Sequence, residues 1–385
     1  MQLSAEMRVL ALFTLAGLVA CGEPIATAPE SESPAFAKGG GSTAPYPVLD
    51  LGGHPTLGGT QAVDVNSNGV IVGNAGLGSY VNEARAMRWT ITASGSVTTE
   101  DLHPLLQPAF RTIAYEINDA GSIVGLRQSG PDAATARPFL LSANGVMTEL
   151  HTRCGPTETT VQGHAYGISE TGAIIGTEVN EGIHALYWAP GAICAEVLPS
   201  EGPGSDPQDI SPDGLVVVGT SPVGGVPQPV RWTRGTDGSW SMTVLPKLSP
   251  SVTPSAIGSD GSIVGWEQRS TLVRKRGSSY YDFSQYAYHW PGGTDVRQLS
   301  TLGGDATWAM DIDGGRIVGS SNQGVDKASH AVVWQPDGTL LDLGTIVVGG
   351  HSFALAVSGK VVVGRADVDT PGRGIETHAV VWTLP

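Results

Sequence analysis

The residues best suited to chemistry are an aspartate and two histidines that no repeated pattern explains. Asp305 with His164 or His351 would supply an acid and a base, as a glycan hydrolase or lyase needs. Arg111 and Trp308 occupy equivalent segments and add an anion contact and an aromatic face. The five residues could hold a sugar or an anion, although polar residues placed by chance in equivalent loops would look the same.

A second cluster is basic and aromatic in an otherwise acidic chain. Arginine and tyrosine are enriched at protein interfaces. The cluster is therefore either a binding surface or a solvated loop that needs no partner. It lies between Gly265 and Trp290 and comprises Glu267, Arg269, Arg274, Lys275, Arg276, Tyr280, Tyr281 and Phe283.

The other titratable residues recur with a repeat, which explains them without catalysis. Asp64, Asp209 and Asp311 occupy one repeated strand position. Asp311-Ile-Asp313-Gly and Asp367-Val-Asp369 lack the full ligand set of a calcium loop. The G-x-S-x-G, H-E-x-x-H and phosphate-loop motifs do not occur. We therefore expect no catalytic residues, no metal site and no cofactor.

The composition is typical of an exported all-β protein. The 385 residues include 53 glycines and 26 prolines, and 15% are charged. The formal net charge of −15 would repel nucleic acids and anionic membrane surfaces. Nucleic acid is therefore excluded as a partner, and the chain is expected to be monomeric.

Residues 1–20 have the features of a signal peptide. Arg8 precedes an uncharged run from Val9 to Ala20 that is too short to span a bilayer. Leu18 to Cys21 resembles the lipobox of bacterial lipoproteins, which implies a lipid on Cys21 and anchoring in the cell envelope. By the same resemblance, Gly22 favours the outer membrane, on its periplasmic or surface face. An ordinary secretory signal with an incidental cysteine is the alternative.

Residues 21–45 contain few large apolar side chains, so they are expected to form a flexible tether. Beyond them, a segment of glycine, two or three apolar residues and glycine recurs. Successive closing glycines are 43 to 54 residues apart, a period typical of propeller blades. The seven copies are Gly69–Gly73, Gly121–Gly125, Gly172–Gly176, Gly214–Gly219, Gly261–Gly265, Gly315–Gly319 and Gly359–Gly364.

Each copy has strands on both sides of this segment. An alternating stretch such as Ala62–Asn66 precedes it and indicates a first strand, which ends in turn-forming residues. A third strand ends in tryptophan, as in His330–Trp334, and a fourth follows a short turn, as in Leu340–Leu343. The second copy departs, with Leu141 in place of the tryptophan. Residues 46–385 are therefore predicted to form a seven-bladed β-propeller of four-stranded blades.

The last copy stops one strand short, at Pro385. The segment Pro47–Gly53 precedes the first copy and matches Leu340–Gly344. It can complete the last blade and so close the ring without an open sheet edge.

These motifs resemble the HAF repeat family of bacterial extracellular proteins. The His-Ala-Phe tripeptide appears as His184-Ala-Leu, His330-Ala-Val and His378-Ala-Val, and a Leu-Gly-Gly link appears at Leu57 and Leu302. The resemblance covers residues 47–385. It implies repeats and export but no particular activity.

Two expectations follow from the blade topology. Links between blades and loops between strands two and three share one face and vary most in length, so a binding surface is expected there. Cys154 and Cys194 fall at the outer edges of neighbouring blades and could form a disulfide in an oxidising compartment.

The sequence favours an envelope-anchored module that binds or scaffolds a protein or glycan. Its candidate binding face comprises Arg111, His164, Arg274, Arg276, Tyr280, Tyr281, Asp305, Trp308 and His351. A glycan hydrolase or lyase is the alternative, and a purely structural envelope role is a third.

Overall fold

The structure is a computed structural model that describes residues 45–76, 83–92, 95–154, 161–179, 181–249, 251–275, 278–293, 295–324 and 328–385, with backbone alone for 273–275 and 278–280. The predicted signal peptide, Cys21, residues 22–44 of the predicted tether, and Arg276 lie outside these ranges. Within them, no helix is long and apolar enough to cross a membrane.

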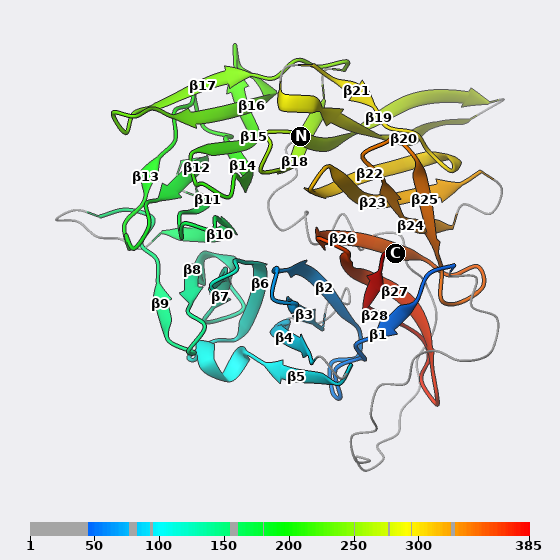
Figure 1. The fold of residues 1–385 in the computed structure, drawn as a ribbon. Helices are drawn as coiled ribbons and strands as arrows, with labels where there is room; N and C mark the ends of the chain where they lie inside the picture. Colours follow the sequence, from blue (N-terminus) through cyan, green and yellow to red (C-terminus); the bar gives the residue numbers. More distant parts are fainter. Residues whose placement is uncertain are drawn as a thin grey trace.

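The chain is all-β, and most of its strands lie in antiparallel four-stranded sheets of consecutive strands. Figure 1 shows the sheets around a common centre, with the first strand of each innermost. The first two sheets consist of β2 (Thr60–Val65), β3 (Val70–Ala75), β4 (Arg85–Ile91) and β5 (Val97–Asp101), then β6 (Arg111–Ile117), β7 (Ile123–Gln128), β8 (Ala136–Leu141) and β9 (Met147–Glu149). The next two consist of β10 (Gln162–Ile168), β11 (Ile174–Val179), β12 (Ile183–Trp188) and β13 (Glu196–Val197), then β14 (Asp206–Ile210), β15 (Val216–Val223), β16 (Val226–Arg234) and β17 (Trp240–Val244).

An eight-stranded sheet follows, in which two sets of four meet through one parallel pair, Gln285 with Ala306. The sets are β18 (Val252–Ile257), β19 (Ile263–Lys275), β20 (Ser278–Trp290) and β21 (Arg297–Gln298), then β22 (Gly303–Asp313), β23 (Arg316–Gln323), β24 (Ser329–Trp334) and β25 (Leu340–Gly344). In the described part of the chain, three short 3-10 helices lie outside the sheets: η1 (His103–Leu106), η2 (Ala133–Thr135) and η3 (Pro291–Gly293).

The remaining sheet joins the two ends of the described chain. It contains β26 (Ser352–Ser358), β27 (Val361–Thr370), β28 (Gly374–Thr383) and, at its outer edge, β1 (Val48–Asp50). β1 pairs antiparallel with β28, so that Val48 faces Trp382. The segment Pro47–Gly53 thus lies beside the last repeat, as the sequence pattern predicted.

The repeated histidine lies within hydrogen-bond distance of the repeated aspartate of the fourth strand. His330 Nδ1 lies 2.9 Å from Asp342 Oδ1 within one sheet. His378 Nδ1 lies 2.9 Å from Asp50 Oδ1, so the same pair connects β28 with β1. In the first sheet Arg85 takes the place of the histidine and pairs with Asp101 at 2.9 Å.

The closing glycine of each repeat faces a β-bulge in the first strand. In the first sheet the bulge lies between Ala62 and Asp64 and brings the Gln61 carbonyl oxygen to 2.0 Å from where a Cβ on Gly73 would stand. No side chain fits there. The first strands of all the other sheets carry a bulge at the equivalent position.

The tryptophans of the third strands pack between neighbouring sheets. Trp382, fully buried, belongs to an apolar cluster that joins residues of its own sheet with Val333 and Leu343 of the sheet before it. Several indoles also donate to a carbonyl that follows the fourth strand of the preceding sheet, as Trp232 Nε1 does to Pro199 at 2.8 Å. The apolar core is therefore divided among the junctions between sheets.

Candidate functional site

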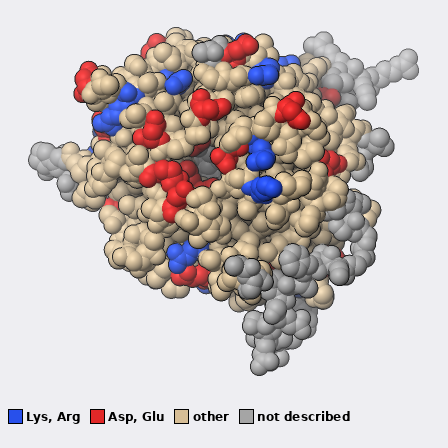
Figure 2. Space-filling model, in the orientation of Figure 1, with Lys and Arg blue, Asp and Glu red and all other residues tan. Residues whose placement is uncertain are grey.

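The first strands surround a cavity of about 1950 Å³. Figure 2 shows acidic side chains gathered around a hollow near the centre of the face in view. The lining comes from the first strands, from turns at one end and from loops between second and third strands at the other. The cavity therefore includes the face on which the sequence analysis expected a binding surface.

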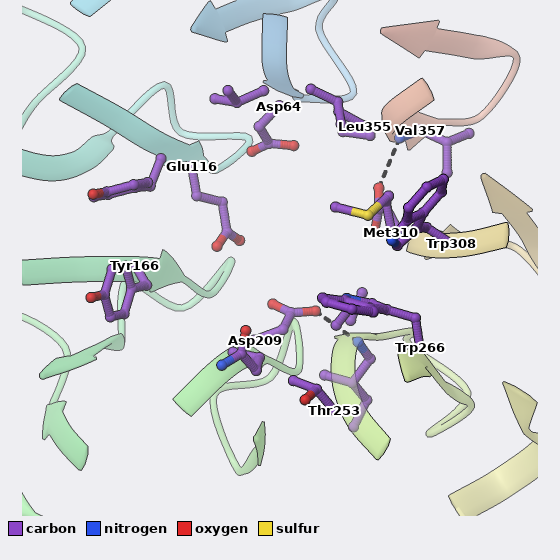
Figure 3. A pocket seen from close by; sticks show the side chains of 18 of the residues that line it. Asp64, Glu116, Tyr166, Asp209, Thr253, Trp266, Trp308, Met310, Leu355 and Val357 are labelled. Carbon is purple, nitrogen blue, oxygen red and sulfur yellow. Dashed lines mark hydrogen bonds between the residues drawn. The ribbon is translucent and has the colours of Figure 1, made fainter. Parts of the chain in front are cut away.

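Four carboxyl groups occupy the bulge position inside this cavity, and we call them the inner carboxyls: Asp64, Glu116, Asp209 and Asp311. A bulge places adjacent side chains on one side of the strand, which accounts for both Val63 and Asp64 lining the cavity. Figure 3 shows the carboxyl groups of Asp64, Glu116 and Asp209 directed toward the same space.

The inner carboxyls accept the backbone N–H groups that follow the bulges. Asp64 accepts from Val65 at 2.7 Å and from Ile117 of the next sheet at 2.8 Å. Asp209 accepts from Ile210 and Ile257, and Asp311 from Ile312 and Val357, at 2.6 to 2.8 Å. Glu116 accepts only one of these backbone N–H groups, that of Ile168.

Seven backbone donors, one from each first strand, are thus satisfied by four acids. Buried N–H groups without an acceptor are costly. The three aspartates each connect two sheets through both carboxylate oxygens, and Glu116 connects a fourth pair of sheets through its bond to Ile168. The primary role that the geometry gives these acids is therefore to hold neighbouring sheets together.

The setting of the inner carboxyls disfavours their charged form. Burial raises the pKa of Asp64 to about 7, of Asp209 to about 8 and of Asp311 to about 6, against the lowering effect of the N–H bonds that each accepts. Burial, followed by the charges of Asp209 and Asp64, also raises the pKa of Glu116 well above its ordinary value. Some of the inner carboxyls are therefore protonated near neutral pH.

Aromatic side chains line the opposite wall. Trp266 and Trp308 lie across the cavity from Glu116 and Tyr166 (Figure 3). Trp266 belongs to a hairpin formed by β19 and β20, which we call the long hairpin. Tyr281 and Phe283 lie on the same face of this hairpin as Trp266. They also line the cavity and are 60% and 50% exposed. The long hairpin thus presents one aromatic face to the cavity mouth.

Of the five residues predicted to hold a sugar or an anion, Asp305 and Trp308 line the cavity, whereas Arg111, His164 and His351 do not. His164 is buried beneath Tyr166, whose hydroxyl lies 2.7 Å from its Nδ1. His351 Nδ1 accepts the backbone N–H of Ser329 at 3.1 Å, which occupies that ring nitrogen. The expected acid and histidine pair is therefore not brought together in the cavity.

Side chains of the basic and aromatic cluster lie on opposite faces of the long hairpin, because successive side chains alternate along a strand. Arg269 forms an ion pair with Glu267, stacks 4.4 Å above the Tyr286 ring and donates to the Tyr288 hydroxyl at 2.7 Å. Arg269 therefore makes its contacts within the protein. The side chains of Arg274, Lys275 and Tyr280, like the whole of Arg276, lie outside the described residues.

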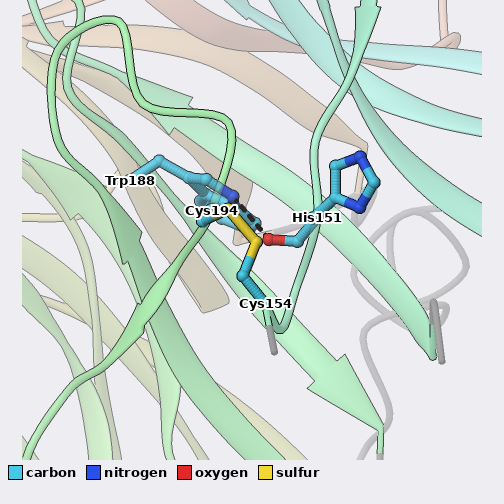
Figure 4. Close-up of a disulfide and its surroundings, with 4 residues drawn as sticks. All are labelled: His151, Cys154, Trp188 and Cys194. Atoms are coloured by element: carbon cyan, nitrogen blue, oxygen red, sulfur yellow. Dashed lines mark hydrogen bonds between the residues drawn. A yellow bond between two sulfur atoms is a disulfide. The ribbon is translucent and has the colours of Figure 1, made fainter. Parts of the chain in front are cut away.

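Cys154 and Cys194 form a disulfide between the outer edges of two neighbouring sheets. Beside it, His151 N donates to the Ile193 carbonyl at 2.7 Å, and Trp188 Nε1 donates to the His151 carbonyl at 3.0 Å (Figure 4). The disulfide reinforces a junction that hydrogen bonds already define.

The common role of the inner carboxyls was not predicted from the sequence, nor was the place of Gln61 and Trp266 in the cavity wall. The signal was present for the acids, since Asp or Glu recurs at one strand position in four of seven copies. Among the described residues, no three His, Cys, Asp or Glu side chains are grouped so as to hold a metal ion.

Comparison with known proteins identifies no family. No family model matches the chain, and no curated protein matches it. Several solved structures are similar. TolB from Acinetobacter baumannii is 11% identical, with a TM-score of 0.43, covering 79% of this chain and 80% of that one. TolB from Agrobacterium tumefaciens, described as putative, is 16% identical, with a TM-score of 0.45, covering 71% and 89%.

A puromycin hydrolase is 16% identical, with a TM-score of 0.52. The match covers 88% of this chain but only 55% of the hydrolase, so the chain spans about half of that protein. At this identity the likeness is one of fold alone. Together with the four-stranded sheets around a centre, it identifies the chain as an all-β protein of the β-propeller type.

Proposed function

We propose that this protein is a seven-bladed β-propeller, anchored in the cell envelope, that binds a protein or a glycan at the mouth of its central cavity. The observation that carries the proposal is the aromatic face of the long hairpin at that mouth. Tyr281 and Phe283 expose large apolar surfaces beside a cavity that Trp266 and Trp308 continue inward. Exposed aromatic patches next to a concavity are typical of binding sites.

The number of blades and their closure are part of this proposal. Seven copies of the repeat support the number, and the pairing of β1 with β28 supports closure through the two chain ends. A closed ring would give the long hairpin a rigid base, because every sheet would pack against two neighbours.

The location is proposed from the N-terminal sequence. The lipobox-like tetrapeptide ending at Cys21 supports export and a lipid anchor, with the outer membrane favoured by Gly22. The resemblance to HAF repeats supports an extracellular or envelope role. A disulfide at Cys154 and Cys194 accords with an oxidising compartment.

The test compares the two classes of envelope ligand on one immobilised full-length chain. One arm offers detergent-solubilised envelope proteins, and the other offers glycan strands freed of protein by protease. Wild type is compared with the double variant Tyr281→Ala, Phe283→Ala. The control is Ile375→Ala, which removes a similarly exposed apolar side chain (57%) from the hairpin between β27 and β28, outside the cavity lining.

We expect one arm to yield a ligand that wild type and Ile375→Ala retain and that the double variant loses by tenfold or more. The arm that yields it identifies the ligand class. Equal retention by all three chains would overturn the assignment of this face.

A further inference from the structure

We infer that the central cavity binds a linear polyamine along its axis, deeper in the same cavity than the Tyr281 and Phe283 contact proposed for a protein or glycan at its mouth. The juxtaposition that points to it is a set of carboxyl groups at successive depths of one cavity, together with aromatic faces and a buried amide oxygen without a partner.

The titratable side chains of the cavity wall are almost all acidic. Ten of its lining residues are Asp or Glu, and Lys360 is the only Lys or Arg among the lining residues that the structure describes. A concave, low-dielectric wall of one sign concentrates ligands of the opposite sign. The occupant favoured by this wall is therefore a cation.

The carboxyl groups are distributed along the axis. Asp206 and Asp305 lie at the starts of the first strands, the inner carboxyls lie at the bulges, and Asp119 and Glu170 lie in the turns that follow. Because the described carboxyls are not grouped in threes, they suit charges spread along a chain better than one compact ion. A polyamine carries ammonium groups separated by short methylene segments, which matches this distribution.

Gln61 provides independent evidence for a ligand. Its side chain lines the cavity and is 4% exposed, yet its Oε1 accepts no hydrogen bond from the described residues. A buried acceptor without a donor costs free energy, and an ammonium or amine N–H would satisfy it. The Trp266 and Trp308 rings can also take a cation on their faces.

The test is calorimetric titration of the full-length chain with spermidine, and with 1,8-octanediol as an uncharged probe of similar length. The variant is Asp206→Asn with Asp305→Asn, which leaves the inner carboxyls in place. The control is Asp237→Asn with Asp337→Asn, which removes two charges from exposed outer turns of the same two sheets. Gln61→Leu tests the buried acceptor, and thermal unfolding verifies that each variant is folded.

We expect spermidine to bind with 1:1 stoichiometry and the diol not to bind. The cavity variant should weaken spermidine binding by about tenfold, whereas the control should change it by less than about twofold. Gln61→Leu should weaken it by about fivefold. Absence of spermidine binding to wild type, or equal weakening in the cavity and control variants, would overturn the inference. Neither result bears on the Tyr281 and Phe283 experiment, which uses other residues and probes.

Discussion

His378 and Asp50 are 328 positions apart in the sequence, yet the Nδ1 of one lies 2.9 Å from the Oδ1 of the other. The pair connects β28 to β1 and repeats the His330 to Asp342 pair found within a single sheet. Burial disfavours a charged imidazole here, but the hydrogen bonds and charges of Asp50 and Glu376 outweigh it and raise the pKa of His378.

The first prediction concerns this pair and pH. Because the folded pKa of His378 is raised, its contribution to stability is present below about pH 6.5 and is lost as pH rises through the folded pKa. Asp50→Asn should therefore cost about 1 kcal/mol at pH 6 and less at pH 9, as measured by denaturant unfolding. Hydrogen exchange should quicken in β1. Asp342→Asn is the control, and it should leave exchange in β1 unchanged.

The second prediction concerns the whole N-terminal strand. Deleting residues 47–53 removes Val48, Leu49 and Leu51, all buried, and exposes the edge of β28. We expect the free energy of unfolding to fall by about 3 kcal/mol or more. Exchange protection should fall in β26 to β28 and stay unchanged in β10 to β12. An unchanged unfolding midpoint would contradict the proposed closure.

The third prediction concerns the inner carboxyls. Their folded pKa values are raised, so the folded state holds extra protons between about pH 4 and the value of about 8 for Asp209, and stability should fall as pH rises through this window. Asp209→Asn loses one acceptor for two N–H groups and should cost about 1 kcal/mol at pH 5. The cost should shrink by pH 8.5, because the asparagine avoids the charge. The exposed turn variant Asp237→Asn should show no such trend.

The fourth prediction concerns the disulfide between Cys154 and Cys194, which closes a loop with a sequence separation of 40. Replacing both cysteines by serine should lower the free energy of unfolding by about 2–4 kcal/mol. Thiol titration of the unreduced, folded chain should detect neither cysteine. Wild type in reductant should unfold like the double serine variant, and a difference between them would point to damage from the substitutions themselves.

The fifth prediction concerns the proposed anchor. Cys21→Ser should yield a chain without lipid, which mass spectrometry and release from the membrane fraction on cell breakage would reveal. If the serine variant fractionates as wild type does, Cys21 is not the anchor.

The sequence predicted the strand sets well because glycines, tryptophans and apolar pairs recur at fixed positions. It also predicted the partner of Pro47–Gly53, since Leu49-Asp-Leu-Gly repeats the motif at Leu341. The wall of the cavity was harder to predict. Alternation assigns residues to opposite faces of a strand, but a bulge places Tyr115 and Glu116 on one face. Likewise, nothing in the sequence indicates that Tyr166 covers His164.

The division of seven N–H groups among four acids also means that the repeats are not interchangeable. Each aspartate serves its own strand and the next one, whereas Glu116 serves only Ile168 among these donors. The strand that receives Glu116 has Gly167 at the acid position, and a Cβ there would stand 2.9 Å from Glu116 Oε2. Exchanging two copies would leave one backbone N–H without a carboxyl acceptor. It would also bring two carboxyl groups to a different backbone N–H. Similar as they look in sequence, the copies therefore have a fixed order, and each is matched to the neighbour that follows it.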